Sequence, residues 1–582
     1  MTIKKLFTER KTVFCLLLSF LSAFSVTYCF FDFDSYSFFS LVFTPFIFAF
    51  IRRVDISQIN ITSKILNFVL SALLSVSFYL TNDMAGKMDA VFSSVITTFL
   101  FAASIAGLTH LLFYVLIYIC NRFIASDFKA FDAQPKKSTF FILWAIIFAS
   151  YFFIFLLYFP GVMAPDSFTQ MYIVSGDLPL SNNHPLVHTL LMLLTTKVTG
   201  YIPWLYVIVQ ILAVSAIFAY LCYYMRKKNV WKWLWYITVA FLAFHPVHTY
   251  NSVTVTKDTL FSAFVLLYSV FVYEICSSKG TWLKKNANKI HFCFTALLMC
   301  LFRSNGILIA LLSTVLILFI LKKNSKSFAV CSCVSIVFYF GIVYGIYPLF
   351  DVEATSVTEA LAIPLQQLCC VVADGKTLSP EIESYLNEIL PLDIIAAEYD
   401  PVSVDAIKFH EQFNGEIISS DLFKFIKAWF EVLLQHPITY IKAYLSEVEA
   451  LWNMSMEVGM LEPSHTSPNF VQANMTPLIP VLHDVYDSVV NISYLSTYAF
   501  FAKPFWNPAL YYALACICGV CCFIKKKYSN LASLIPVFAL FVSVAVSMPR
   551  ATAGRYVYAI FCCIPLIIFA AVEQNKKDNI NN

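Results

Sequence analysis

The sequence predicts an all-α polytopic membrane protein with about 14 transmembrane helices. Of its 582 residues, 59% are hydrophobic and only 13% are charged, whereas a soluble domain of average usage has about 25% charged residues. The mean hydropathy is +0.74. So few charges could not cover a water-facing surface, which excludes a soluble enzyme, a disordered chain and a nucleic-acid binder. The 17 cysteines lie mostly inside apolar runs and show no metal-ligand spacing and no disulfide framework.

Charge is distributed unevenly along the chain. Residues 348–503 hold 21 acidic and 6 basic side chains (net −15), and the rest holds 14 acidic and 33 basic ones (net +19), which sum to the overall +4. An acidic block of this length predicts a mostly helical, water-exposed domain, with one or two helices over 423–452 broken at His436-Pro437. The basic remainder should mark cytoplasmic helix ends, because Lys and Arg are retained inside.

The N-terminal apolar runs alternate with basic clusters. Four basic residues precede the first run, so we expect a cytoplasmic N-terminus, and the absence of a small-residue cleavage site predicts a retained helix rather than a signal peptide. Each later basic cluster then lies on the inner side. The expected spans in this part of the chain are 13–30, 38–51, 65–80, 91–120 and 138–159.

The next run, 186–198, is only about half the ~20 residues that a span needs. If it crossed the membrane, the span at 202–225 would end outside at three consecutive basic residues, against the positive-inside rule. We therefore expect 186–198 to lie on the outer interface, which places both termini in the cytoplasm. The remaining expected spans are 202–225, 234–244, 259–276, 291–302, 307–321, 328–347, 506–524, 531–548 and 556–572.

These spans divide the chain into four parts. Residues 1–137 form extra N-terminal transmembrane helices. Residues 138–347 form a transmembrane core whose first outer loop covers 160–201. Residues 348–505 form the acidic extracytoplasmic domain, and 506–582 form the C-terminal transmembrane helices with a short cytoplasmic tail.

The loops assigned to the outer face hold most of the unusual polar side chains, which could converge into one cavity. Each has a structural alternative: Asp166 could cap a helix, Lys257 and Asp258 could form a local ion pair, and the late arginines could anchor lipid headgroups. His184 and His188 share a helix face and could bind a metal, but two ligands are not a site. No cofactor is therefore assigned, and a divalent metal is left open.

The order of the motifs resembles the membrane glycosyltransferases of the GT-C fold, such as protein O-mannosyltransferases and the aminoarabinose transferase, and a group of bacterial multi-pass proteins placed near that fold. The motifs are Pro165-Asp166-Ser167, Asn183-His184-Pro185, Lys257-Asp258-Thr259, Arg303-Ser304-Asn305-Gly306 and Pro364-Leu365-Gln366-Gln367. The resemblance covers 138–572 and implies a GT-C-like core, a polyprenyl-phosphate-linked sugar donor and a reaction on the outer face. The chain departs from the family in having one clear loop carboxylate, with Asp177 the only other, and four helices before the core.

The residue types suit glycosyl transfer. An attacking acceptor hydroxyl must lose a proton, which the loop carboxylate Asp166 could take, with His184 beside it. Negative charge builds up on the leaving phosphate, and outer cations could stabilise it. The candidates for that role are Arg550, Arg555, Lys257 and Arg303. Further candidates for substrate contact are Asn183, His188, Asp258, Asn305, Gln366, Gln367 and Tyr556.

We therefore expect a glycosyltransferase of the bacterial plasma membrane that transfers a sugar to a cell-envelope glycan, lipid or protein. Its partners would be the lipid-linked donor, the acceptor and membrane lipids, with no nucleic acid. No Gly-rich phosphate loop indicates a nucleotide sugar. Two alternatives stay open. A transporter or flippase of lipid-linked sugars would need charges within spans and paired half-repeats, and the other alternative is a non-catalytic scaffold with an ectodomain.

Overall fold

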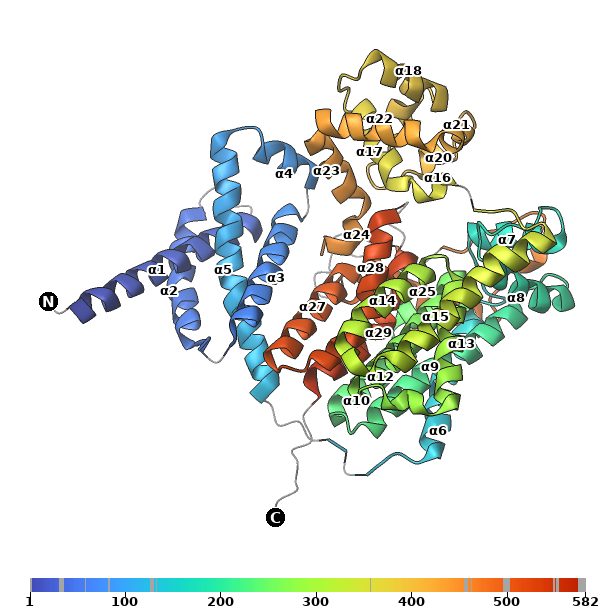
Figure 1. The fold of residues 1–582 in the computed structure, drawn as a ribbon, viewed down its shortest axis with the longest axis horizontal. Helices are drawn as coiled ribbons and strands as arrows, with labels where there is room; N and C mark the ends of the chain where they lie inside the picture. The colour runs from blue at the N-terminus through green and yellow to red at the C-terminus, as the bar shows by residue number, and fades with distance from the viewer. Residues whose placement is uncertain are drawn as a thin grey trace.

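The computed structural model is almost entirely helical (Figure 1). Within the residues it describes, one sheet occurs, a parallel pair of two-residue strands. The described residues are 3–30, 36–57, 59–81, 84–125, 130–131, 133–355, 357–454, 459–461, 463–495, 503–547, 550 and 554–573.

Nine of the described helices are long and apolar enough to cross a membrane, which confirms a polytopic membrane protein. They are built on α1 (Ile3–Phe30), α3 (Ile61–Leu80), α5 (Val95–Ala125), α6 (Lys137–Leu157), α9 (Trp204–Lys227), α12 (Lys257–Ser277), α14 (Asn305–Leu321), α15 (Lys326–Phe340) and α29 (Tyr558–Val572). Adjoining 3-10 or π-helical turns lengthen the last three to continuous helical segments over Asn305–Asn324, Lys326–Phe350 and Gly554–Val572.

The other five expected spans form helices of 13 to 18 residues, shorter than the ~20 residues that a span needs. The count of about 14 is therefore not reached on length alone within the described chain. These five helices are α2 (Tyr36–Arg53), α10 (Lys232–Phe244), α13 (Asn286–Phe302), α27 (Pro508–Ile524) and α28 (Ile535–Ser547).

The N-terminal helices form a module beside the main bundle (Figure 1). In it, α1 packs on α2 and α5, α3 packs on α5, and α27 joins α3 to the main bundle. Small polar residues allow this close approach: Ser22 Oγ lies 3.0 Å from Nδ1 of His110, and Ser25 Oγ donates to the carbonyl of Ala103. Such contacts are typical of helix pairs in lipid.

Two helices, α12 and α29, form the centre of the main bundle. In each of these spans 83% of the apolar window is buried, against 22–56% in the other seven candidate spans of the described chain. They pack on each other, α12 also contacts α9 and α13, and α29 also contacts α27. A helix that is apolar on every side is expected at such a central position.

Residues 357–454 form a helical domain at one end of the bundle, with its own apolar core. Its main helices are α17 (Ala362–Ala373), α18 (Pro380–Ile389), α22 (Leu422–Gln435) and α23 (Pro437–Glu447). The expected break at His436-Pro437 is confirmed, because α22 ends before His436 and Pro437 opens α23.

The rest of the acidic block returns to the membrane core. We call residues 463–478 the strap. Its backbone N–H groups donate to the carbonyls of residues that lead into the first outer loop: His465 to Met163 at 2.8 Å, and Thr476 to Phe159 at 2.6 Å. The strap therefore packs with the main bundle, as do Val448, Ala450 and Leu451, which belong to the core of that bundle, while the buried core of the independent domain runs from Ala362 to Tyr440.

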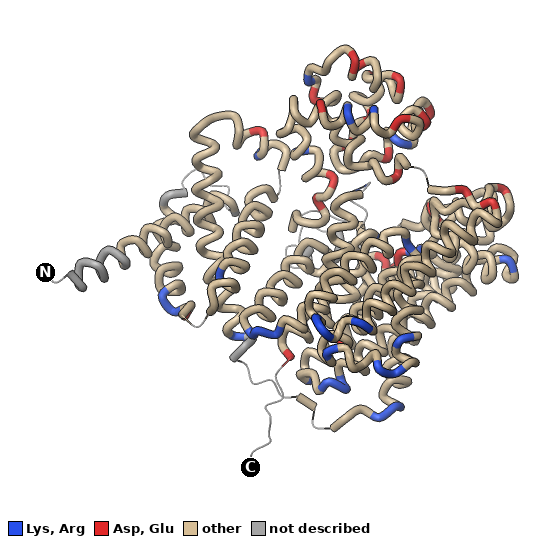
Figure 2. Tube along the Cα trace, in the orientation of Figure 1, with Lys and Arg blue, Asp and Glu red and all other residues tan. Residues whose placement is uncertain are grey.

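Charges gather at opposite ends of the molecule. Lys and Arg cluster at one end of the bundle, and most Asp and Glu lie at the other end, where the 357–454 domain sits (Figure 2). One basic end is the pattern that the positive-inside rule produces.

Candidate functional site

The parallel strand pair brings two helix starts together. Strand β1 (Val162–Met163) pairs with β2 (Thr254–Val255), with Met163 opposite Val255. Helix α7 (Pro165–Ser175) begins two residues after β1, and α12 begins two residues after β2. Asp166 and Lys257 therefore lie side by side, each in the first turn of its helix.

Local contacts fix this arrangement. Gly161 has φ +138°, and a Cβ there would lie 2.7 Å from Cγ2 of Val207, so only glycine fits at the entry to β1. Ser167 Oγ accepts from the N–H of Ala164 at 3.1 Å and donates to the carbonyl of Val255. Ser167 thus holds the start of α7 against β2. These contacts do not involve the carboxylate of Asp166, which binds other partners.

Three cationic or imidazole groups meet at one oxygen of Asp166. Its Oδ2 lies 3.3 Å from Nζ of Lys257, 3.2 Å from Nη1 of Arg555 and 4.0 Å from Nδ1 of His184. Nζ of Lys257 also donates to Nδ1 of His184 at 2.9 Å, so this ring nitrogen acts as an acceptor. Asp166 and His184 of the first outer loop therefore form one cluster with Lys257 and Arg555, which come from two distant segments.

Arg303 and Asp258 form a second ion pair, which Arg555 connects with Asp166. Arg303 Nη1 binds Oδ1 of Asp258, whose side chain is only 2% exposed. Arg555 Nε lies 4.0 Å from the other oxygen of Asp258. The guanidinium groups of Arg303 and Arg555 lie 4.7 and 5.2 Å from the ring centre of Tyr556, so this ring contacts both cations.

The cluster contains three basic side chains (Lys257, Arg303 and Arg555) and two carboxylates, a net charge of +1 when all five are ionised. Burial disfavours ionisation of Asp166, but the nearby Lys257 and Arg555 outweigh it and hold the pKa of this carboxyl well below its usual range. Burial and Lys257 lower the pKa of His184 to about 4, so its imidazole is neutral at pH 7. In this state Asp166 is ionised but a weak proton acceptor.

His188 lies in α8 (Leu186–Thr196) and is fully buried. Its Nε2 lies 2.7 Å from the hydroxyl of Tyr206, which donates to Oε1 of Gln210 at 2.9 Å. The amide of Gln210 donates to the carbonyl of Thr254 in β2 at 2.8 Å. This buried chain holds α8 against β2, so His188 positions the loop that carries His184 rather than contacting the cluster.

The two histidines, which share no helix because α8 begins at Leu186, have separate partners: Nδ1 of His184 faces Lys257 and Nε2 of His188 faces Tyr206. Across the described ranges, no group of three or more His, Cys, Asp or Glu is arranged to hold a metal ion.

The two late arginines separate. Arg555 joins the cluster, whereas Arg550 is exposed and pairs through its backbone with Ser403 of the 357–454 domain. Its charge lies near Asp405. Burial raises the pKa of the Asp405 carboxyl, and Arg550 is one of several cations that partly offset this rise. The sequence pattern gave no signal that distinguishes these two arginines.

The other residues predicted to contact the substrate do not all lie at the cluster. Asn183 precedes His184 and its N–H donates to Oγ of Ser181, and Asn305 opens α14 two residues after Arg303. Gln366 and Gln367 are buried in α17, where their amides donate to the carbonyls of Asp400 and Tyr440. These two glutamines hold the core of the 357–454 domain and do not belong to the cluster.

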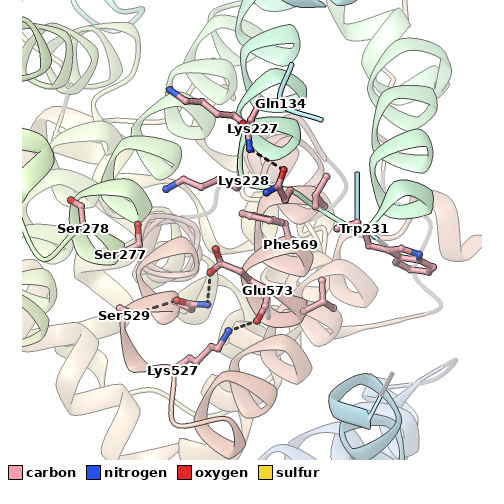
Figure 3. A pocket seen from close by; sticks show the side chains of 15 residues that line it. Gln134, Lys227, Lys228, Trp231, Ser277, Ser278, Lys527, Ser529, Phe569 and Glu573 are labelled. Atoms are coloured by element: carbon pink, nitrogen blue, oxygen red, sulfur yellow. Dashed lines mark hydrogen bonds between the residues drawn. The ribbon is translucent and has the colours of Figure 1, made fainter. Parts of the chain in front are cut away.

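A cavity of about 580 Å³ lies at the opposite ends of the same central helices (Figure 3). Lys527 donates to the carbonyl of Glu573 beyond α29, and Lys228 Nζ lies 2.6 Å from Glu274 in the last turn of α12. Lysines that bind helix C-termini in this way compensate the negative end of the helix dipole. We therefore regard this cavity as part of the basic end of the bundle, where lysines stabilise the helix ends.

One comparison with known proteins finds a match. The model of a family of unknown function, DUF6020, matches residues 172–582, more than two thirds of the chain. No curated protein and no solved structure matches it. The matched region includes His184, Lys257, Arg303 and Arg555 and begins six residues after Asp166.

Proposed function

This chain belongs to the DUF6020 family, and we propose that it is a membrane glycosyltransferase with a GT-C-like core. It transfers a sugar from a polyprenyl-phosphate-linked donor to a cell-envelope glycan, lipid or protein on the outer face of the bacterial plasma membrane. The observation that carries the proposal is the convergence of Asp166, Lys257 and Arg555 from three separate segments.

Lys257 and Arg555 bind the donor phosphate. Both lie within 3.3 Å of a carboxylate oxygen that a phosphate oxygen could replace. A guanidinium offers a planar fork of donors suited to phosphate, and an ammonium adds a compact charge. Arg303 is held by the buried Asp258, so it supports the positive potential and the position of Asp258 rather than binding the donor directly.

The reaction follows from these positions. The oxygen of an acceptor hydroxyl attacks the anomeric carbon of the sugar, and its proton passes to the carboxylate of Asp166. The bond between that carbon and the phosphate oxygen breaks, and the electron pair leaves with the phosphate. Lys257 and Arg555 stabilise the charge that develops there.

The sidedness of the molecule supports an outer site. The cluster lies at the N-terminal ends of α12 and α29, and the basic cavity lies at their C-terminal ends. If the basic end is cytoplasmic, the cluster faces outward, where a lipid-borne donor replaces a nucleotide sugar. The short helix α8 exposes Leu190 and Leu194 on one face, which suits a helix lying in the outer interface beside the cluster.

A transfer assay tests this function. Proteoliposomes containing the protein receive geranylgeranyl phosphates linked to radiolabelled hexoses, pentoses or aminoarabinose, together with a cell-envelope extract. We expect label to pass to the extract with the wild type and not with Asp166→Asn, which removes the proton acceptor at nearly unchanged shape. Asp177→Asn is the matched control, because Asp177 is exposed on the same loop and bonds Ser175 rather than the cluster.

The alternatives give different results in the same vesicles. Label that crosses the bilayer on its prenyl carrier without reaching the extract would indicate a flippase. If the wild type, the Asp166→Asn variant and empty vesicles transfer and translocate the same amount of label for every sugar, the result would contradict the transferase and support the scaffold.

A further inference from the structure

Asp166 is the shared counter-ion of Lys257 and Arg555. Both strong cationic contacts of its side chain go to the single oxygen Oδ2, and the side chain is 28% exposed, the most open of the cluster's charged groups. We propose that Asp166 is an exchangeable counter-ion: the phosphate of the lipid donor displaces it from Lys257 and Arg555, and only then is it free to act as a base. This inference rests on the proposed function and concerns the regulation of the same site.

The two carboxylates of the cluster differ in the way that exchange requires. Asp258 is 2% exposed, binds Arg303 tightly and accepts from Oγ of Thr256 at 3.2 Å. Asp166 is 28% exposed, so its carboxylate can be reached from outside the cluster, whereas that of Asp258 cannot. An incoming anion therefore replaces Asp166, while Asp258 keeps Arg303 in place.

The exchange also changes the chemistry of the carboxylate. Lys257 and Arg555 are the groups that suppress proton uptake by Asp166, and burial acts in the opposite direction. When a phosphate engages both cations, their influence on Asp166 is neutralised and the effect of burial remains. The base is thus weak in the empty site and strong in the loaded one, which protects the enzyme from activating a hydroxyl before a donor is present.

Binding of a prenyl monophosphate tests the exchange without any turnover. Binding of geranylgeranyl phosphate to the detergent-solubilised full-length protein is measured at fixed ionic strength. We expect Asp166→Asn to bind roughly tenfold more tightly than the wild type, because the competing anion is gone. Asp177→Asn, which removes the same charge from the same loop outside the cluster, should bind like the wild type, and geranylgeraniol should bind all three proteins equally.

Weaker or unchanged binding of the phosphate by Asp166→Asn, with weakened binding by Arg555→Ala, would overturn the exchange while leaving the lipid-phosphate site intact. Inorganic phosphate distinguishes the source of the anion: tighter binding of it by Asp166→Asn would support the exchange for a free phosphate as well as a lipid one. If neither the wild type nor Asp166→Asn binds geranylgeranyl phosphate better than geranylgeraniol, the proposed function falls together with the exchange. The thermal unfolding midpoint of each variant shows that it is folded.

Discussion

At the residue scale, the two arginines before the last helix have different surroundings although only four residues lie between them. Arg555 contacts the carboxylates of Asp166 and Asp258 and the ring of Tyr556. Arg550 is exposed and pairs with Ser403 of the 357–454 domain. The positive-inside rule predicts that both arginines lie at the same end of the bundle. Which of them faces the cluster depends on the conformation of the turn before α29.

Arg555→Ala should therefore weaken binding of geranylgeranyl phosphate by about 10- to 150-fold, because a charge-assisted contact contributes roughly 1.5–3 kcal/mol. Arg555→Lys should recover only part of this, since a point charge does not reproduce the fork of the guanidinium. Arg550→Ala is the matched control and should bind like the wild type. Equal losses in both alanine variants would show that long-range charge, rather than contact, attracts the lipid.

His184 should make the protein less stable in mild acid. Its pKa is about 4 when folded and about 6.5 when unfolded, so between these values the unfolded chain binds more protons. The free energy of unfolding then falls as pH falls, by about 2 kcal/mol at pH 5. Thermal unfolding midpoints measured from pH 7 to pH 5 should decrease less in His184→Asn than in the wild type.

The control for that measurement is His291→Asn, which removes an exposed histidine from α13. Its midpoints should follow the wild type across the pH range. A decrease of equal size in His184→Asn and the wild type would mean that His184 does not contribute to the acid sensitivity.

At the element scale, the turn between α13 and α14 holds Arg303 in place through a close helix contact. A Cβ on Gly306 would collide with the carbonyl oxygen of Met299 and would lie 2.7 Å from Cα of Cys300. The N–H of Gly306 also donates to the carbonyl of Arg303 at 2.9 Å. Glycine is therefore required here by the approach of two backbones.

Gly306→Ala should push α14 away from α13 and cost roughly 1–3 kcal/mol of stability, the range typical of overpacking. The thermal unfolding midpoint should fall accordingly. Gly345→Ala is the control, because nothing lies within 4 Å of a Cβ at that exposed position. If both substitutions leave the midpoint unchanged, the contact between the two helices is not tight.

Most helices could be predicted from sequence because an apolar run of sufficient length has few other stable forms in a membrane. The break at His436-Pro437 was also predictable, since proline cannot continue a helix. The strands β1 and β2 were not, because two residues each are too few for a periodic pattern. They nevertheless decide the site, because their register places Asp166 beside Lys257.

At the scale of the whole molecule, one end of the bundle is basic and the other carries the acidic domain (Figure 2). Single cysteines at Lys376 in that domain and at Lys323 at the end of α14 report the two sides. We expect a membrane-impermeant maleimide to label Lys376→Cys in intact cells and Lys323→Cys only after permeabilisation, with the wild type measuring the reaction of native cysteines. The reverse pattern would place the cluster in the cytoplasm.

The two central helices connect the charged cluster with the basic end of the bundle. Helix α12 starts at Lys257 and α29 begins just beyond Arg555, and their far ends are tied together where the hydroxyl of Tyr273 donates to Glu573 at 2.6 Å. The two helices are thus connected at both ends, and α12 is about 30 Å long. A force applied at the basic end of the bundle, by bilayer bending or by a docked protein, would tilt both helices and shift the geometry of the charged cluster at their other ends.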